Sequence, residues 1–251
     1  MTAHPAPGPA DARTIPERAA ALATAVSASI VVIAIAILPF VTPAWVSFEQ
    51  GRAQAAAWTG YSQADLGLAT NAILHDLVLG PPDFAVEVGG TPVLEERERS
   101  HMRDVRGVFA GFYLLAAIAT VGLIVLVAGA RRMGHPERAW SALSSGMRGL
   151  IVGIVIVGAI AAVAFDQLFE LFHTLFFPAG SFTFDPRTDR LVQLFPFDFW
   201  SETTIVLGVV IVAAAAVLAV VTGRLARRSV RHDSEASAAD AILGARPEAA
   251  R

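Results

Sequence analysis

Histidines and carboxylates recur at helical spacing in two parts of the sequence. The first cluster contains Glu98, His101 and Asp104, each three residues from the next. On a helix these side chains lie on neighbouring turns, where they can hydrogen-bond laterally. An imidazole with an ordinary pKa of about 6.5 both accepts and donates protons near neutral pH. The first cluster therefore has residue types suited to general acid–base chemistry.

The second cluster contains Asp166, Glu170 and His173, at positions i, i+4 and i+7. This spacing places the three side chains on one helical face. Ionisable groups near a membrane are costly to bury and usually face the interior of a helix bundle or a wet cavity. Because the two clusters are expected at the same membrane depth, on separate membrane spans, we expect His101 and His173 to converge on one site.

A structural interpretation of these residues must be weighed as well. A lone histidine at a helix end near the membrane interface is more often a solvated cap than a catalyst. The alternating Glu and Arg residues at 95–99 are typical of a solvated face, and His75 is expected on the polar side of a short helix. The functional hypothesis therefore depends on the pairing of two His–carboxylate faces rather than on either face alone.

The elements that must position these clusters are membrane-spanning helices. Of 251 residues, 55% are apolar and 16% are charged, whereas a soluble domain is about a quarter charged. A hydrocarbon core of about 30 Å needs roughly 20 helical residues. Four apolar stretches are that long: 19–40, 107–130, 149–173 and 203–223. The sequence therefore predicts an all-α membrane protein, with a four-span membrane domain at 19–223.

Arginine placement predicts the orientation of the spans. The segments 1–18, 131–148 and 224–251 carry ten arginines close to span ends, whereas the loop 174–202 carries two. Positively charged segments tend to remain in the cytoplasm. We therefore expect both tails to be cytoplasmic and the segments 41–106 and 174–202 to be extracytoplasmic. The first apolar run exceeds the 7–15 residues of a signal peptide, which favours an uncleaved anchor.

The tails and the external segment differ in pattern. Residues 1–18 and those after about 232 are expected to be disordered, because they are rich in Ala, Pro or mixed charge and have little apolar pattern. In the segment 41–106, Ser62 begins a helical pattern that Gly80-Pro81-Pro82 ends. The alternation over 84–88 before Gly89-Gly90 is compatible with a small strand pair. We therefore expect an extracytoplasmic cap of short helices.

Composition excludes several classes of chemistry. The chain has no cysteine, which excludes disulfides, thiolate nucleophiles and Cys-ligated metals. A net charge of −3 argues against a nucleic-acid partner. The phenylalanines and the tryptophan at 176–200 are interpreted as anchors at the lipid headgroup level. Within that loop, Asp189 is expected to hold an arginine or histidine partner.

Several short motifs resemble a known family. In chain order they are Glu98-x-x-His101-Met-x-Asp104-Val105, Asp166 followed by Phe172-His173-x-x-Phe176-Phe177, Phe184-Asp185-Pro186-x-x-Asp189, and Pro196-x-x-Phe199. Their order and their spacing relative to the spans resemble the bacterial four-span family that includes the lipoprotein intramolecular transacylase. One departure is Phe182, where the resemblance leads us to expect tryptophan.

The resemblance implies an acyltransferase at the outer leaflet of the bacterial cell membrane. The expected substrate is the N-terminus of a diacylglyceryl-modified lipoprotein. Membrane lipids are further expected partners. The sn-2 acyl chain would move onto the α-amino group of the modified cysteine, giving the lyso form. His101 and His173 match the family motifs and would be catalytic; no metal or other cofactor is implied.

The residues are compatible with this reaction. The amine and the ester belong to one molecule, so proximity alone supplies several kcal/mol, on the order of 7–11 in ideal systems. One imidazole would remove a proton and another group would stabilise the oxyanion. The expected orienting carboxylates are Glu98, Asp104, Asp166, Glu170 and Asp189.

Two alternatives stay open at this point. His101, Asp104, Glu170 and His173 have the residue types of a metal-dependent membrane lipid hydrolase, although no HExxH signature is present. A non-enzymatic lipid-binding membrane subunit is the second alternative. It predicts that histidine substitutions leave lipid chemistry unchanged. A transporter is disfavoured, since no pair of spans is broken by Gly or Pro at corresponding positions.

Overall fold

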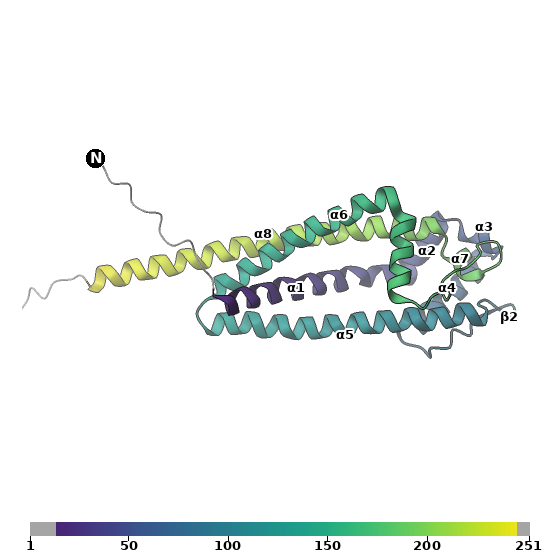
Figure 1. Cartoon of the computed structure of the whole chain (residues 1–251), viewed down its shortest axis with the longest axis horizontal. Coiled ribbons are helices and arrows are strands. Elements are labelled where there is room, and N and C mark those ends of the chain that lie inside the picture. Colours follow the sequence, from purple (N-terminus) through teal and green to yellow (C-terminus); the bar gives the residue numbers. More distant parts are fainter. Residues whose placement is uncertain (1–13, 245–251) are drawn as a thin grey trace, which may run out of the picture.

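The computed structural model describes residues 14–244, which form a bundle of four long helices with a cap at one end (Figure 1). The long helices are α1 (Ile15–Ile37), α5 (Glu96–Arg132), α6 (Pro136–Phe176) and α8 (Phe197–Gly244). Each contains a segment long and apolar enough to cross a membrane. The prediction of an all-α membrane protein with four transmembrane helices is confirmed.

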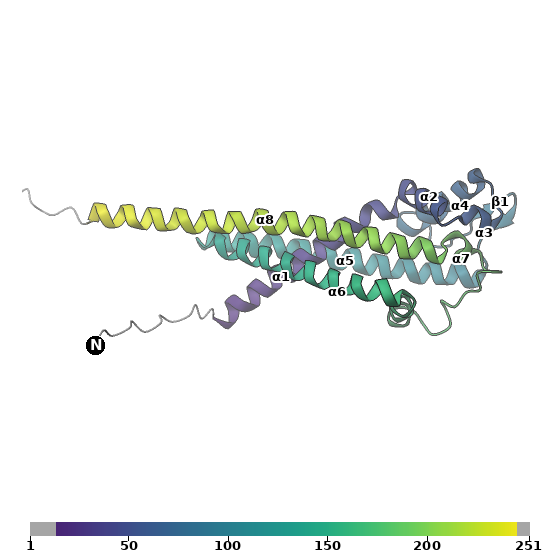
Figure 2. The ribbon, with the colours of Figure 1, turned by 90° about the horizontal axis from the view of Figure 1, so that it is seen from above.

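Small residues allow the long helices to approach closely. Helix α1 contacts α5, α6 and α8, while α6 packs along α8, and Figure 2 shows α1 crossing the other helices obliquely. A Cβ atom at Gly146 of α6 would lie 2.7 Å from the Cα atom of Ala25 in α1. Ser144 donates a hydrogen bond of 2.9 Å to the carbonyl oxygen of Ala219 in α8. Close packing and interhelical hydrogen bonds of this kind hold helices together in lipid.

The cap consists of short elements from two separate parts of the chain. Its core is a cluster of buried apolar side chains from α3, α4, the segments that flank the strands, α7 and the start of α5, including Ile73, Phe84 and Leu194. The 3₁₀ turn Leu38–Val41 leads from α1 into it. The elements of the cap are α2 (Pro43–Arg52), α3 (Ala55–Thr59), α4 (Gln63–Val78), β1 (Glu87–Val88), β2 (Thr91–Pro92) and α7 (Arg190–Leu194).

Local sequence signals explain two of these elements. Ser62 accepts a hydrogen bond of 3.1 Å from the backbone N–H of Asp65 and so caps α4. The strands β1 and β2 pair antiparallel. Gly89 and Gly90 join them with φ angles of 60° and 78°, a conformation that glycine adopts without steric cost. The small strand pair therefore forms where the alternation and the two glycines indicated it.

Helix α6 bends sharply before its end. Ala164 has φ −145° and ψ 43°, outside the helical region, and the segment after it crosses the end of the bundle from α8 towards α5 (Figure 1). Phe165 packs edge-on against Phe197 at a centroid distance of 5.2 Å. Phe169 lies 6.2 Å from the ring of Trp200. These contacts hold the base of the bent segment on α8.

All four long helices extend beyond the predicted spans: α5 begins at Glu96 rather than near residue 107, and α6 at Pro136 rather than near residue 149. Helix α1 begins at Ile15 rather than at residue 19, and α8 continues through Gly244 rather than ending near 223. The expectation of disorder after about 232 therefore differs from the structure as far as Gly244. Alanine, which is frequent there, has high helix propensity. The expected disorder at 1–13 and 245–251 falls outside the described residues.

Candidate active site

The two histidines of the sequence motifs meet at the capped end of the bundle. His101 comes from the first turns of α5 and His173 from the last turn of α6. Their rings stack with centroids 6.0 Å apart and an interplanar angle of 23°. His101 is buried, whereas His173 is partly exposed. The bend at Ala164 makes this meeting possible, because it turns the end of α6 towards α5.

Aromatic side chains form the walls around both rings. Phe177 lies 4.8 Å and Phe184 5.4 Å from the centroid of His101. Phe169 and Phe182 lie 4.2 Å and 5.3 Å from that of His173. The interpretation of the loop aromatics as headgroup anchors therefore misses the contacts of Phe177, Phe182 and Phe184 with the histidines. The spacing of Phe169, His173 and Phe177, each four residues from the next, is a signal of a shared helical face that sequence reasoning did not use.

The ring nitrogens have different surroundings. The Nδ1 atom of His173 lies 2.7 Å from the carbonyl oxygen of Phe169. Since a carbonyl can only accept, Nδ1 carries the proton in this bond and Nε2 of the neutral ring has a free lone pair. In contrast, Nδ1 of His101 is buried and has no hydrogen-bond partner among residues 14–244. One ring therefore offers a base, and the other a buried nitrogen that is available to a substrate.

Glu98 is buried beside the histidines but bonds to backbone rather than to a ring. Its side chain is 1% exposed. One carboxylate oxygen accepts from the N–H of Leu191 at 2.6 Å, and the other from that of Glu95 at 2.7 Å. Glu98 thus joins the start of α5 to the start of α7. The expectation that it orients an imidazole directly has no contact to support it.

Asp189 and Arg97 hold the loop that carries Phe184. Asp189 accepts hydrogen bonds of 2.7 Å from the Nη2 atom of Arg97 and from the backbone N–H of Asp185. The Arg97 guanidinium also lies 4.8 Å from the centroid of Phe184, a cation–π contact. These contacts hold the ring of Phe184 beside that of His101. Sequence reasoning anticipated an arginine partner for Asp189 but assigned Arg97 to a solvated face.

The remaining predicted carboxylates do not bond to the rings. Among the described residues, Asp104, Asp166 and Glu170 form no hydrogen bond or ion pair with either histidine. Asp166 and Glu170 are exposed on the bent segment. Within residues 14–244, no three His, Asp or Glu side chains lie close enough to hold a metal ion. The ligand set of the hydrolase alternative, His101 and His173 with Asp104 and Glu170, is therefore not assembled.

A second charged cluster links α2 to α8. Glu49 is 1% exposed, and burial, together with the neighbouring Glu202, raises the pKa of its carboxyl. Arg52 donates from Nε to Glu202 at 2.6 Å. Sequence reasoning missed this cluster because its members are 150 residues apart and neither segment carries a motif.

The fold is similar to that of solved membrane proteins. The structure of the membrane integral lipoprotein intramolecular transacylase Lit from Bacillus cereus aligns with a TM-score of 0.72, covering 88% of this chain and 98% of that chain at 17% identity. A variant of that protein with a histidine replaced by arginine aligns with a TM-score of 0.69, covering 88% of this chain and 95% of that chain, also at 17% identity. At this identity the likeness concerns the fold.

Sequence comparison adds a relative and a family. An uncharacterized protein of Aquifex aeolicus (strain VF5) is 27% identical over 146 residues, which cover 57% of this chain and 61% of that relative. The match thus spans less than two thirds of the relative's length. The model of the family described as lipoprotein intramolecular transacylase Lit matches residues 22–200, well over half of the chain. The chain therefore belongs to the lipoprotein intramolecular transacylase Lit family.

Proposed function

We propose that this membrane protein moves the sn-2 acyl chain of a diacylglyceryl-modified lipoprotein onto the α-amino group of its N-terminal cysteine. Membership of the transacylase family supports an acyltransferase. The observation that carries the proposal is the stacked pair His101 and His173, 6.0 Å apart between aromatic walls. Two imidazoles at one end of the membrane bundle suit a reaction between an amine and an ester of one lipid-anchored molecule.

In the proposed reaction, the amine nitrogen attacks the sn-2 ester carbonyl. The Nε2 atom of His173 accepts the proton that the amine loses, because Nδ1 is already occupied by the carbonyl of Phe169. A carbon–nitrogen bond forms, and the bond between the carbonyl carbon and the sn-2 oxygen breaks. The proton then passes from His173 to that oxygen. The products are an N-acyl amide and a glyceryl hydroxyl.

His101 suits stabilisation of the tetrahedral intermediate. Its Nδ1 is buried and unpartnered among the described residues, so that in the Nδ1-protonated form it is available to donate to the oxyanion. A buried donor aimed at developing charge is worth more than the same donor in water. Phe177 and Phe184 exclude water from its faces. The reaction needs no side-chain nucleophile, because the substrate supplies both the amine and the ester.

Mass spectrometry of lipoprotein N-terminal peptides tests this function. With the protein present, peptide fragments are expected to carry one acyl chain on the amine and one on glyceryl; without it, both chains remain on glyceryl. Release of free fatty acid without an N-acyl product would instead support a hydrolase. Unchanged lipid chemistry would support a lipid-binding subunit.

We also infer that both termini are cytoplasmic and that the histidines lie at the outer leaflet. The arginines at the end of the bundle opposite the cap support this orientation. A cysteine at Thr91, in the cap, should react with a membrane-impermeant thiol reagent in intact cells. One at Met133, which is 71% exposed between α5 and α6, should react only after lysis. The reverse labelling pattern would contradict the orientation.

A further inference from the structure

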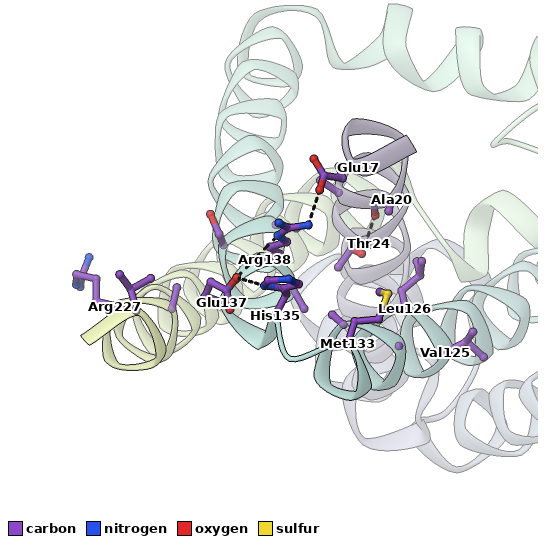
Figure 3. Close-up of a pocket in the computed structure, with 18 of the residues that line it drawn as sticks. Glu17, Ala20, Thr24, Val125, Leu126, Met133, His135, Glu137, Arg138 and Arg227 are labelled. Atoms are coloured by element: carbon purple, nitrogen blue, oxygen red, sulfur yellow. Dashed lines mark hydrogen bonds and ion pairs between the residues drawn. The ribbon is translucent and has the colours of Figure 1, made fainter. Parts of the chain in front are cut away.

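A cavity of about 930 Å³ lies at the end of the bundle opposite the histidines, as Figure 3 shows in close-up. All four long helices contribute to its lining, together with the turn between α5 and α6. Ligand pockets in proteins range from roughly 300 to 1,000 Å³. The cavity is therefore large enough for the head group of an amphiphile and the first part of its chains.

The lining divides into an apolar part and a charged part. Ala20, Ala21, Val125 and Leu126 are among the apolar residues, and they belong to the hydrophobic stretches of α1 and α5. The charged residues lie beyond these stretches, at the start of α1, at the start of α6 and in the part of α8 that follows its apolar stretch. They are Glu17, His135, Glu137, Arg138, Arg227 and Arg231. This division matches a molecule that has hydrocarbon at one end and an ionic group at the other.

Arg138 is the best-placed cation of the cavity. Its Nη1 atom pairs with Glu17 and its Nε atom lies 3.8 Å from Glu137, contacts that Figure 3 draws on one wall. No partner is present for Nη2 in residues 14–244, and the side chain is 51% exposed. A guanidinium has five N–H donors in a planar fork that fits phosphate. Arg227, at the rim, is exposed and adds positive charge.

Glu137 adds an acceptor beside this cation. Its Oε2 atom is buried and has no hydrogen-bond partner in the described part of the chain, while Oε1 lies 3.3 Å from Nδ1 of His135. A buried carboxylate oxygen without a donor is costly. A bound group that carries both a phosphate and hydrogen-bond donors would satisfy Arg138 and Glu137 together.

We propose that this cavity binds a glycerophospholipid from the leaflet opposite the histidine site. Its phosphate would lie on Arg138 and its chains against the apolar part of α1 and α5. The head group would carry donors beyond the phosphate, such as the hydroxyls of phosphatidylglycerol or the ammonium of phosphatidylethanolamine, which bond to Glu137. The trimethylammonium of phosphatidylcholine has no N–H or O–H and leaves Glu137 unsatisfied.

Native mass spectrometry of the delipidated full-length protein tests this proposal. Phosphatidylglycerol, phosphatidylethanolamine and phosphatidylcholine with identical chains are titrated separately. The first two should bind about tenfold or more tightly than the third, because charge-assisted hydrogen bonds are worth about 1.5–3 kcal/mol each. Glycerol 3-phosphate, which lacks chains, should bind too weakly to be retained. Equal retention of all three lipids, or retention of glycerol 3-phosphate, would overturn the proposal.

Matched variants separate the charged and apolar parts of the cavity. The double substitution R138Q and R227Q should weaken binding of all three lipids, because each lipid carries a phosphate. Glu17→Gln should bind them as the wild type does, because it breaks the same ion pair but keeps the cation. Gly129→Leu should reduce binding of all lipids by filling the apolar part, since a Cβ atom there meets no atom within 4 Å. Arg187→Gln, at the capped end, controls for net charge. Wild-type binding by either cavity variant would refute the site, and thermal unfolding checks that each variant is folded.

Discussion

The site has two walls, one on α5 around His101 and one on α6 around His173, and different interactions hold them in place. On the α5 side, the side chains around His101 are fixed by buried and partly buried hydrogen bonds: Glu98 bonds to two backbone amides, and Asp189 bonds to Arg97. On the α6 side, His173 lies on a bent helical segment that packs against α8 through the aromatic rings of Phe165 and Phe169. Hydrogen bonds therefore fix the surroundings of His101, whereas aromatic contacts fix the segment that carries His173.

This difference indicates that the carboxylates hold the backbone and side chains around the histidines in position, whereas the proposed chemistry is left to the two imidazoles. On the α5 side the carboxylates satisfy backbone and arginine donors, which leaves both imidazoles free of carboxylate partners. Removing an acceptor from buried donors costs about 1–3 kcal/mol each, whereas an aromatic pair is worth about 0.5–1.5 kcal/mol beyond its buried area. We therefore expect the α5 wall to be rigid and the α6 wall to be the more adaptable one.

The largest expected effect is on the rate of acyl transfer when either histidine is replaced. His101→Ala and His173→Ala should each slow acyl transfer by roughly 10²–10⁴-fold, the usual value of acid–base assistance. The double substitution should be scarcely worse than either one, because the rings act as a unit. The mass of lipoprotein N-terminal peptides measures the transfer. His75→Ala is the control, since that side chain is 61% exposed on α4; full transfer by either single variant would remove the paired-histidine mechanism.

The second prediction breaks the polar wall. Glu98→Ala leaves the buried N–H group of Leu191 and the partly buried one of Glu95 without an acceptor, which should destabilise the protein by roughly 2–4 kcal/mol. Thermal unfolding in detergent measures the change. Glu96→Ala, two residues away on the surface with a side chain 70% exposed, should stay within about 0.5 kcal/mol of wild type. Equal Tm values for the two variants would mean that Glu98 does not hold the wall.

The third prediction weakens the aromatic wall. Phe169→Ala removes the ring contacts to His173 and Trp200, so acyl transfer should fall about tenfold, at a stability cost near 1–2 kcal/mol. Leu175→Ala, on the same segment but 70% exposed, should leave transfer unchanged. If Phe169→Ala lowered Tm more than Glu98→Ala does, the contrast between the walls would be reversed.

The smallest effect concerns the charged cluster between α2 and α8. Burial and Glu202 raise the pKa of Glu49 above its ordinary value of 4.5, so the folded protein binds this proton more tightly than the unfolded chain. The associated stability is fully present below pH 4.5 and is lost as the pH rises through the raised pKa. Glu49→Gln should therefore gain Tm relative to wild type between pH 4 and pH 7. Glu87→Gln, which is exposed, should show no such gain; a constant offset for Glu49→Gln would contradict the raised pKa.

Local patterns predicted much of the fold. The four spans follow from apolar length, the cap of α4 from Ser62, and the hairpin from Gly89 and Gly90. The convergence of His101 and His173 followed from their equal depth at span ends. Each of these inferences needs only residues that are close together in the chain, or the fixed thickness of a membrane.

The details of the site depend on contacts that a single sequence does not reveal. The bend at Ala164 occurs without proline or glycine at that position and is supported by aromatic contacts to α8. Arg97 and Asp189 are 92 residues apart. Their pairing depends on how the loop packs on α5. The bonding of Glu98 to backbone amides depends on the same packing. Residue type predicted the chemistry of these groups but not their partners.

The bend in α6 also bears on the depth of the proposed site in the membrane. The segment after Ala164 runs across the bundle axis (Figure 1), with Leu171, Leu175 and Phe176 exposed on it. In a bilayer, a helix that lies flat with apolar side chains outward rests at the boundary between hydrocarbon and head groups. The ester linkages of diacylglycerol groups lie at that boundary whatever the length of their chains. Under the proposed function, this segment would hold His173 at the level of the ester, so that substrates with long and short acyl chains should react alike.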